Sequence, residues 1–268
     1  MAGPAREQSA EIGIIGGSGI YDPGLLEDAK QVEVKTPYGS PSDRITLGVY
    51  AGRKVAILPR HGVKHQFNPS NVPYRANISA LKQLGVTHVI SPCAVGSLQD
   101  GIHPGDFVFV DQFIDRTTMR QQSFYDKGRV CHISVADPVC PDMHRILCEA
   151  AKKLGFRHHE KGTYVCIEGP RFSTRAESRL YRSWCAHVIG MTMVPECVLA
   201  REAELCYAGI ATITDYDTFR EDAVSIEKIL QTMKGNLENV KKLLLEAIPK
   251  VPAERRCGCK DALKGALL

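Results

Sequence analysis

Short apolar runs and longer apolar stripes alternate along almost the whole chain. The runs predict strands near residues 11–16, 44–50, 54–58, 86–93, 107–114, 162–167, 187–194 and 208–214. Stripes at helical spacing predict helices at 73–84, 143–154 and 174–186, after residue 195 and from residue 225. Strands that alternate with helices are typical of the α/β class. We therefore expect a single domain with a central, largely parallel or mixed β-sheet flanked by helices.

The predicted domain covers residues 11–250, between a flexible N-terminal segment at 1–10 and a C-terminal tail at 251–268. Residues 1–10 contain no apolar stretch of the kind that secretory signals need. No apolar run approaches the roughly 18 residues that would cross a bilayer. These features predict a cytoplasmic protein that does not enter a membrane.

The charge balance argues against nucleic acid as a partner. The 34 basic and 30 acidic side chains leave a net charge of 34 − 30 = +4. Residues 249–268 alone hold five Lys and Arg against two Asp and Glu, so three of these charges lie in the tail. The body is close to neutral, and any anion that it binds must be held by a few placed residues.

Two aspartates, Asp215 and Asp217, end the buried strand predicted at residues 208–214. Side chains alternate along a strand, so both carboxylates point to one face if the strand continues through them. Neighbouring carboxylates repel each other, and one of them then keeps its proton near neutral pH. Such a group can protonate a leaving group. The simpler alternative is a pair of turn or helix-capping aspartates.

Two other strand ends carry groups that suit an anion. Residues 11–20 form an apolar strand and a glycine-rich turn with Ser18, which can bind phosphate through its hydroxyl and backbone N–H groups or can be a plain tight turn. Arg60 and His61 follow the strand at 54–58, where open α/β sheets place ligands. His61 and His65 are poor candidates for metal ligands, because no Glu follows the first His and Lys64 repels a cation. The sequence therefore predicts an anion site without a metal.

Ten cysteines are many for such a chain, and eight of them occur singly, as buried apolar residues do. Cys257 and Cys259 form a C-x-C pair instead. This pair lacks the two-residue spacer and the second pair of a zinc finger, which argues against a structural zinc site. A strained disulfide and a pair of free thiols remain as alternatives.

Taken together, the strand-end motifs resemble the trimeric purine nucleoside phosphorylase family, and most closely its methylthioadenosine phosphorylase branch. The matching segments run in the family's order from residue 12 to about 248 and read IGIIGGSGIYDP, TPYGSPSD, LPRHG, YRANISALKQLGVTHVI, DQFIDRTTMR, IEGPRFSTRAES, GMTMVPE and ATITDYD. The resemblance implies a purine nucleoside phosphorylase-like fold. It also implies attack of phosphate on C1′ of 5′-methylthioadenosine, which gives adenine and 5-methylthioribose 1-phosphate.

The resemblance also implies roles for individual residues. Phosphate would be held by Ser18, Arg60, His61, the backbone of Ala94, and Thr192. Met191 would contact the ribose hydroxyls, and Phe172 and Ser173 would lie beside the sugar and base. Asp215 would protonate purine N7, and Asp217 would help to read the 6-amino group. Phosphate is a co-substrate, and no cofactor is implied.

Related enzymes for 6-oxopurines carry Asn in the position of Asp215, so the aspartate pair favours adenine over hypoxanthine. An acceptor facing a 6-oxo group leaves a buried mismatch that costs about 10⁴-fold in specificity. A purine nucleoside phosphorylase of broader range, acting on adenosine, inosine or guanosine, remains the alternative. A non-catalytic nucleoside-binding protein is disfavoured by the presence of the phosphate residues and the acid. A hydrolase would use water and would need no Arg60 clamp.

The branch further implies an oligomer whose subunits share the site. Ile226, Ile229 and Leu230 would form one part of an apolar pocket for the 5′ substituent, and His132 of a neighbouring subunit would form another. The expected assembly is a homotrimer, or a hexamer made of two trimers. The C-terminal C-x-C resembles heat-stable archaeal members that disulfides reinforce. That likeness implies a Cys257–Cys259 bridge, with Cys140 and Cys206 as a further candidate pair.

Overall fold

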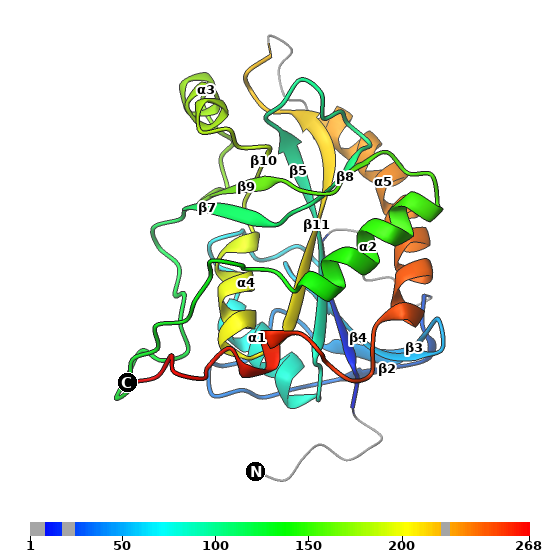
Figure 1. The fold of residues 1–268 in the computed structure, drawn as a ribbon, viewed down its shortest axis with the longest axis vertical. Helices are drawn as coiled ribbons and strands as arrows, with labels where there is room; N and C mark the ends of the chain where they lie inside the picture. The colour runs from blue at the N-terminus through cyan, green and yellow to red at the C-terminus, as the bar shows by residue number, and fades with distance from the viewer. Residues whose placement is uncertain (1–8, 18–24, 221–225) are drawn as a thin grey trace.

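The computed structural model describes residues 9–17, 25–220 and 226–268 (Figure 1). Its strands are β1 (Ile12–Gly16), β2 (Glu27–Val32), β3 (Ile45–Tyr50), β4 (Arg53–Pro59), β5 (His88–Ser97), β6 (Phe107–Phe109), β7 (Gln112–Arg116), β8 (His158–His159), β9 (Thr163–Ile167), β10 (Val188–Gly190) and β11 (Cys206–Tyr216). Its α-helices are α1 (Tyr74–Gln83), α2 (Pro141–Lys153), α3 (Arg175–Ser183), α4 (Met193–Glu202) and α5 (Ile226–Ala247). Two short 3₁₀ turns follow, η3 (Ile248–Lys250) and η4 (Gly258–Asp261). None of the described helices combines the length and apolar character that crossing a membrane requires.

One mixed sheet joins the described strands, in the order β2-β3-β4-β1-β5-β10-β9-β7, with β11 pairing β5 and β6, and β8 pairing β6. The centre is parallel: β1 pairs β4 and β5, and β11 follows β5 from its first residue to its last. A single domain with a mixed central sheet was the expectation from the sequence, and the sheet confirms the α/β class.

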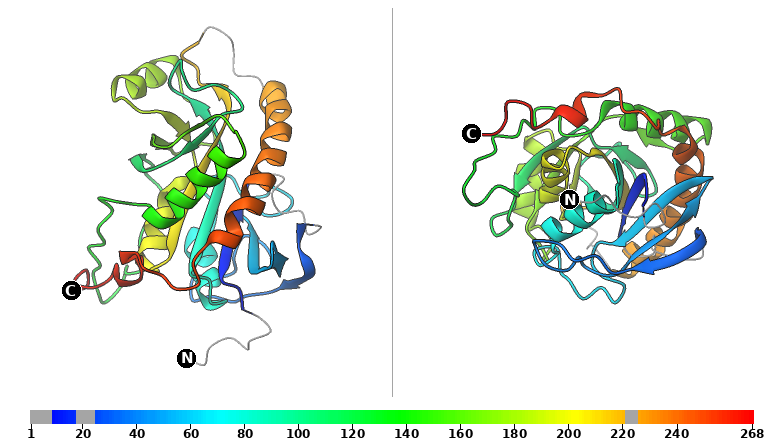
Figure 2. Two further views of the ribbon diagram at one scale, coloured as in Figure 1. Left: turned by 45° about the vertical axis from the view of Figure 1, so that its right-hand side comes forward. Right: turned by 90° about the horizontal axis from the view of Figure 1, so that it is seen from below.

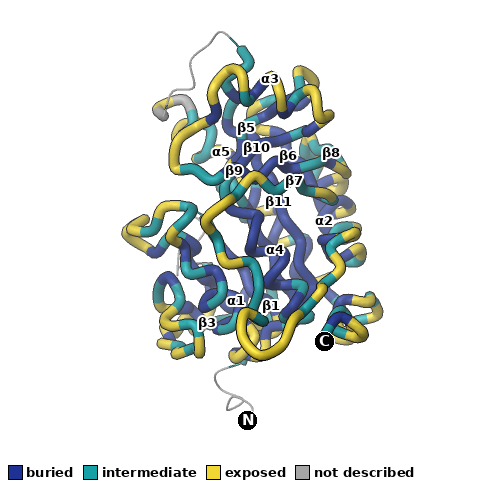
Figure 3. Tube along the Cα trace, turned by 90° about the vertical axis from the view of Figure 1, so that its left-hand side faces the viewer, coloured by how far each residue is buried: buried dark blue, intermediate teal, exposed yellow. Residues whose placement is uncertain are grey.

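Helices cover both faces of the sheet, and two apolar clusters fill the layers between them (Figure 2). α1 and α4 pack on one face, where Leu81 and Leu199 belong to a shared cluster. α2 and α5 pack on the other, where Leu147 and Leu244 belong to a second cluster. Central parallel strands are therefore buried on both sides, which is why β1 and most of β11 read as continuous apolar runs (Figure 3).

Three local predictions from the sequence were wrong. The polar strand β2 was missed because it lies at the sheet edge, and five of its six residues are exposed. The strand expected at 107–114 is broken into β6 and β7, because β6 pairs with β11 and β8 whereas β7 pairs with β9. Residues 94–97, expected as a turn, stay in β5 because β11 remains paired with them as far as Ser97.

Candidate active site

A cavity of about 380 Å³ lies where the strands of the parallel centre end. Its walls come from the residues that follow β1, β4 and β10, from the last part of β5 and from the end of β11, and α5 closes one side. Open α/β sheets place ligands at this edge, because the loops and free backbone groups of several strands meet there. The described site residues expected from the sequence, apart from His132, line this cavity: Arg60, His61, Ala94, Phe172, Ser173, Met191, Thr192, Asp215, Asp217, Ile229 and Leu230.

The structure does not describe the side chains of two expected residues, and a third does not line the cavity. Ser18 lies outside the described residues, and so does the side chain of Ile226 at the start of α5. His132 is exposed and does not line the cavity of its own chain. Its backbone N–H donates to Ala266 O at 2.8 Å, so the C-terminal residues hold its segment.

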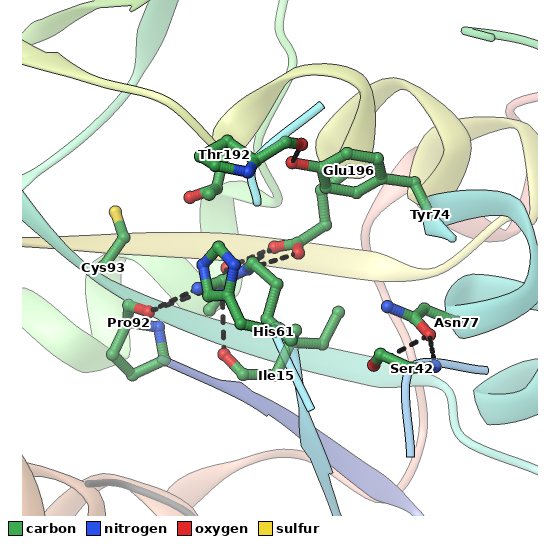
Figure 4. A network of polar contacts seen from close by, with 12 residues as sticks. Ile15, Ser42, His61, Tyr74, Asn77, Pro92, Cys93, Thr192 and Glu196 are labelled. Atoms are coloured by element: carbon green, nitrogen blue, oxygen red, sulfur yellow. Dashed lines mark hydrogen bonds and ion pairs between the residues drawn. The ribbon is translucent and has the colours of Figure 1, made fainter. Parts of the chain in front are cut away.

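Arg60 is the most deeply buried charged group of the cavity wall, with 1% of the residue exposed. Its Nε and Nη2 donate to the two carboxylate oxygens of Glu196 at 2.8 and 3.2 Å. Nη2 also donates to Ser91 Oγ at 2.7 Å and to the carbonyl of Ile15 at 3.1 Å (Figure 4). Burial lowers the pKa of Arg60, but the charge and hydrogen bonds of Glu196 outweigh it, so the net pKa is raised. The guanidinium is a fixed positive charge.

The remaining nitrogen of this guanidinium, Nη1, is not bonded to Glu196. Nη1 donates to Pro92 O at 3.3 Å and lies 3.7 Å from the point where a Cβ at Gly17 would stand. A glycine there leaves the approach to Nη1 open. An anion in the cavity can therefore reach the edge of Arg60 that Glu196 does not occupy, while Glu196 fixes the direction of that edge.

His61 beside it is neutral. Burial lowers the pKa of His61 to about 4, and the positive charge of Arg60 adds to this effect. Nδ1 lies 2.9 Å from Phe67 O, and since a carbonyl only accepts, Nδ1 carries the proton. Nε2 is then an acceptor for a protonated phosphate oxygen, and a dianion at the site would raise the pKa of the imidazole again.

Arg60 donates to Pro92 O, whereas Asp215 pairs with Gly96, four residues further along β5, so these two side chains lie toward opposite ends of the cavity. Asp215 and Asp217 both line the cavity, as the sequence predicted. The pairing of β11 with β5 shifts register between Ile213 and Asp215. Thr214 Oγ1 donates to Asp215 Oδ1 at 2.6 Å. Burial raises the pKa of Asp215 to about 6; the bond from Thr214 opposes this shift, and the charge of Asp217 adds to it. The site therefore contains a carboxyl group that holds its proton to unusually high pH.

Asp217 is 4% exposed and is held by Ser173, whose hydroxyl lies 2.7 and 2.6 Å from the two carboxylate oxygens. Both aspartates pack against Gly96, where a Cβ would lie 3.4 Å from Asp215 Oδ2 and from Asp217 Cβ, and only 3.1 Å from Ile189 Cγ2. The close approach explains the glycine. The loop containing Phe172 and Ser173 is thus tied to the end of β11.

Sequence reasoning missed three residues that build this site. Glu196 was considered only as part of a helix and of a family motif, yet it orients Arg60. Arg120 joins two cavity segments, because Nη1 donates to Met191 O at 2.6 Å and Nη2 to Glu168 O at 2.6 Å. Asn236 of α5 donates to Ile213 O at 2.9 Å beside the register shift. The sequence feature that could have identified Asn236 is its position as a polar residue within the apolar stripe of α5.

Comparison with known proteins decides the family. A sequence model described as the Phosphorylase superfamily matches residues 11–249. The S-methyl-5'-thioadenosine phosphorylase of Nitrosopumilus maritimus is 55% identical over 260 residues, which cover 97% of this chain and 99% of the relative. The enzyme of that name from Pyrococcus furiosus is 57% identical over 254 residues, or 95% and 98% of the two chains. This chain belongs to the S-methyl-5'-thioadenosine phosphorylase family.

Solved structures of the family share the fold described above. A methylthioadenosine phosphorylase from an antarctic soil metagenomic library aligns with a TM-score of 0.92 and 46% identity, covering 97% of this chain and 93% of its own. A variant of the adenosine/methylthioadenosine phosphorylase of Schistosoma mansoni, solved with methylthioadenosine, aligns with a TM-score of 0.90 and 38% identity. That alignment covers 96% of this chain and 97% of the other.

We expect Glu196→Gln to destabilise this phosphorylase strongly. The amide keeps the shape of the side chain but leaves the buried guanidinium of Arg60 without a counter-charge, which costs about 3–5 kcal/mol. Urea unfolding at one fixed protein concentration measures the loss. Glu238→Gln is the matched control, because Glu238 is 61% exposed beside Lys241 and should cost less than about 1 kcal/mol. Equal losses in the two variants would contradict the assigned role of Glu196.

Proposed function

We infer that this protein cleaves 5′-methylthioadenosine with phosphate to give adenine and 5-methylthioribose 1-phosphate. The observation that carries the inference is one cavity with a buried Arg60 at one end and a carboxyl group of pKa about 6, Asp215, at the other. The family membership supports it, because relatives at 55% and 57% identity are named for this substrate.

The Arg60 end holds the nucleophile. A phosphate oxygen attacks C1′ while the C1′–N9 bond breaks, so the anion must lie beneath the sugar and stay there. Arg60 supplies a fixed positive charge, and His61 and Thr192 supply polar groups at the same wall. Thr192 makes no side-chain capping bond to α4, so its hydroxyl is not committed to the helix. Ala94 contributes backbone, and Ser18 belongs to the same proposed set.

The Asp215 end makes adenine a better leaving group. The electron pair of the C1′–N9 bond moves into the purine, and Asp215 gives its proton to N7 as this charge develops. Asp217, whose oxygens are oriented by Ser173, accepts from the 6-amino group. A 6-oxo group would face acceptor to acceptor there, which is the basis for preferring adenine to hypoxanthine. Met191 and Phe172 contact the ribose and base.

The 5′ pocket is completed by a second subunit. Leu230 is 54% exposed and Phe172 is 47% exposed, although both line the cavity. Large apolar side chains at a cavity rim are typical of surfaces that another chain covers. His132, which is exposed and does not line the cavity of its own chain, is the residue that we assign to a neighbour's pocket. The proposed assembly is a homotrimer or a dimer of trimers. A cytoplasmic location stays a prediction.

We expect adenine release from methylthioadenosine only when phosphate is present, and little hypoxanthine release from inosine. Base release measured for each nucleoside with and without phosphate provides the test. Comparable release from inosine would instead support the broader purine nucleoside phosphorylase. Release without phosphate would support a hydrolase, and no release from any nucleoside would support a binding protein.

Asp215→Asn should lower turnover of methylthioadenosine by about 10²- to 10⁴-fold, because the amide cannot deliver the proton. Relative activity on inosine should rise, since the amide can donate to a 6-oxo group. In the wild type, kcat/KM should fall as the pH rises above about 6, where Asp215 loses its proton. Phosphate titrates in the same way for the variant, but kcat/KM of the variant should not show this fall, because the amide has no proton to lose. An unchanged profile and unchanged preference would remove Asp215 from its role.

The oligomer should appear as a trimer or hexamer in light scattering after size exclusion. His132→Ala should then raise KM for methylthioadenosine several-fold and leave KM for adenosine nearly unchanged, because only the 5′-methylthio group reaches the apolar pocket. Adenosine is the internal control for folding and assembly. A monomeric, fully active enzyme would exclude the shared site.

A further inference from the structure

Four cysteines from distant parts of the sequence meet at one point of the fold. The sulfur atoms of Cys140, Cys206, Cys257 and Cys259 all lie within 4.8 Å of one another. Cys140, Cys206 and Cys259 are buried, and Cys257 is half-buried. The second cysteine pair, whose lack argued against zinc in the sequence, is therefore supplied by the fold. This four-cysteine cluster lies among residues that the proposed reaction does not use.

The spacing of the sulfurs fits one shared centre. Cys257 Sγ lies 3.3 Å from Cys206 Sγ and 3.6 Å from Cys140 Sγ. Four thiolates at about 2.3 Å from a tetrahedral zinc ion stand about 3.8 Å apart. A disulfide requires about 2.05 Å, and all ten cysteines are free in the structure. The sequence expectation of Cys257–Cys259 and Cys140–Cys206 bridges is thus not met, because Cys257 faces both members of the other pair.

Regular backbone fixes two of the four ligands. Cys140 directly precedes α2, and its N–H donates to Tyr207 O at 2.8 Å. Cys206 begins β11, and its N–H donates to Thr87 O at 2.9 Å. Both sulfurs are therefore held on the rigid part of the domain, as a preformed half-site for a metal must be.

The other two ligands come from the C-terminal segment, which the body also holds by hydrogen bonds. Cys257 and Cys259 flank the start of η4. Arg255 Nη1 donates to Glu204 O at 2.6 Å just before them. Arg201 Nη1 donates to Cys259 Sγ at 3.6 Å. A tetrathiolate zinc centre carries two negative charges, and a guanidinium at a ligating sulfur is the kind of outer partner that offsets them.

We propose that Cys140, Cys206, Cys257 and Cys259 form a structural zinc site that fastens the C-terminal segment to the domain. Four thiolates with no exchangeable position are the ligand set of closed, non-catalytic zinc centres. The fastened segment pairs with residues 130–132, where His132 N–H donates to Ala266 O and Leu268 N–H donates to Val130 O at 3.0 Å. The metal therefore stabilises the segment that holds His132.

Metal analysis of untagged protein, purified without chelator and without a thiol reductant, tests the site directly. We expect zinc in equimolar amount with the chain after dialysis. The intact mass of the denatured, metal-free chain should be that of ten free cysteines. Replacement by cobalt should give the visible absorption of a tetrahedral thiolate complex, which reports ligand type without any variant.

The double variant Cys257→Ser and Cys259→Ser should lose the zinc and melt at a lower temperature. Cys185→Ser is the control, because Cys185 is exposed and is not part of the four-cysteine cluster; it should keep both zinc and melting temperature. A chelator should lower the melting temperature of the wild type and of this control but not that of the double variant.

Three outcomes would overturn the proposal. A chain without zinc whose mass is lower by two hydrogens per bridge would show disulfides instead. Iron in place of zinc would assign a different metal centre. Zinc retained by the double variant would locate the ion elsewhere. None of these outcomes affects the base-release test, so the zinc site and the proposed reaction are tested independently.

Discussion

The buried ion pair between Arg60 and Glu196 is the constraint around which the cavity is built. Taking both charges out of water costs several kcal/mol per ion, and only complete hydrogen bonding offsets this cost. Five parts of the chain contribute to it: Arg60 follows β4, Glu196 lies on α4, and the end of β1, β5 and Tyr207 of β11 supply oxygen atoms. The neighbouring strands β4, β1, β5 and β11 must therefore stay in register for the pair to remain satisfied.

Because this pair fixes a positive charge at one end of the cavity, the two ends of the cavity differ chemically. One end presents a guanidinium that cannot lose its charge. The other presents Asp215, whose pKa burial raises to about 6. An anion and a proton donor at opposite ends of one pocket suit a reaction in which a nucleophilic anion replaces a base. In the proposed reaction, Asp217 is oriented by Ser173 and fixes the base by hydrogen bonding rather than by charge alone.

In the proposed assembly, a neighbouring subunit completes the remainder of the pocket. Leu230 and Phe172 line the cavity while about half of each is exposed, and His132 does not line it. The segment that carries His132 is held by the C-terminal residues, and these contact the domain at the four-cysteine cluster. In the proposed assembly, the C-terminal segment therefore positions the residue that lines the neighbour's 5′ pocket.

The sequence by itself determined the α/β class, most strands and helices, and which strand ends carry Arg60, His61 and the aspartate pair. These features could be predicted because period-two and helical patterns are local properties of the chain. The same local patterns missed the polar edge strand β2 and extended β5 too little, since pairing partners decide where a strand ends. Only the tertiary structure decided that Glu196 fixes Arg60, that Asn236 supports the bulge of β11, and that four distant cysteines share one point. Those contacts join residues far apart in sequence, and their positions follow from the packing of the whole sheet and its helices.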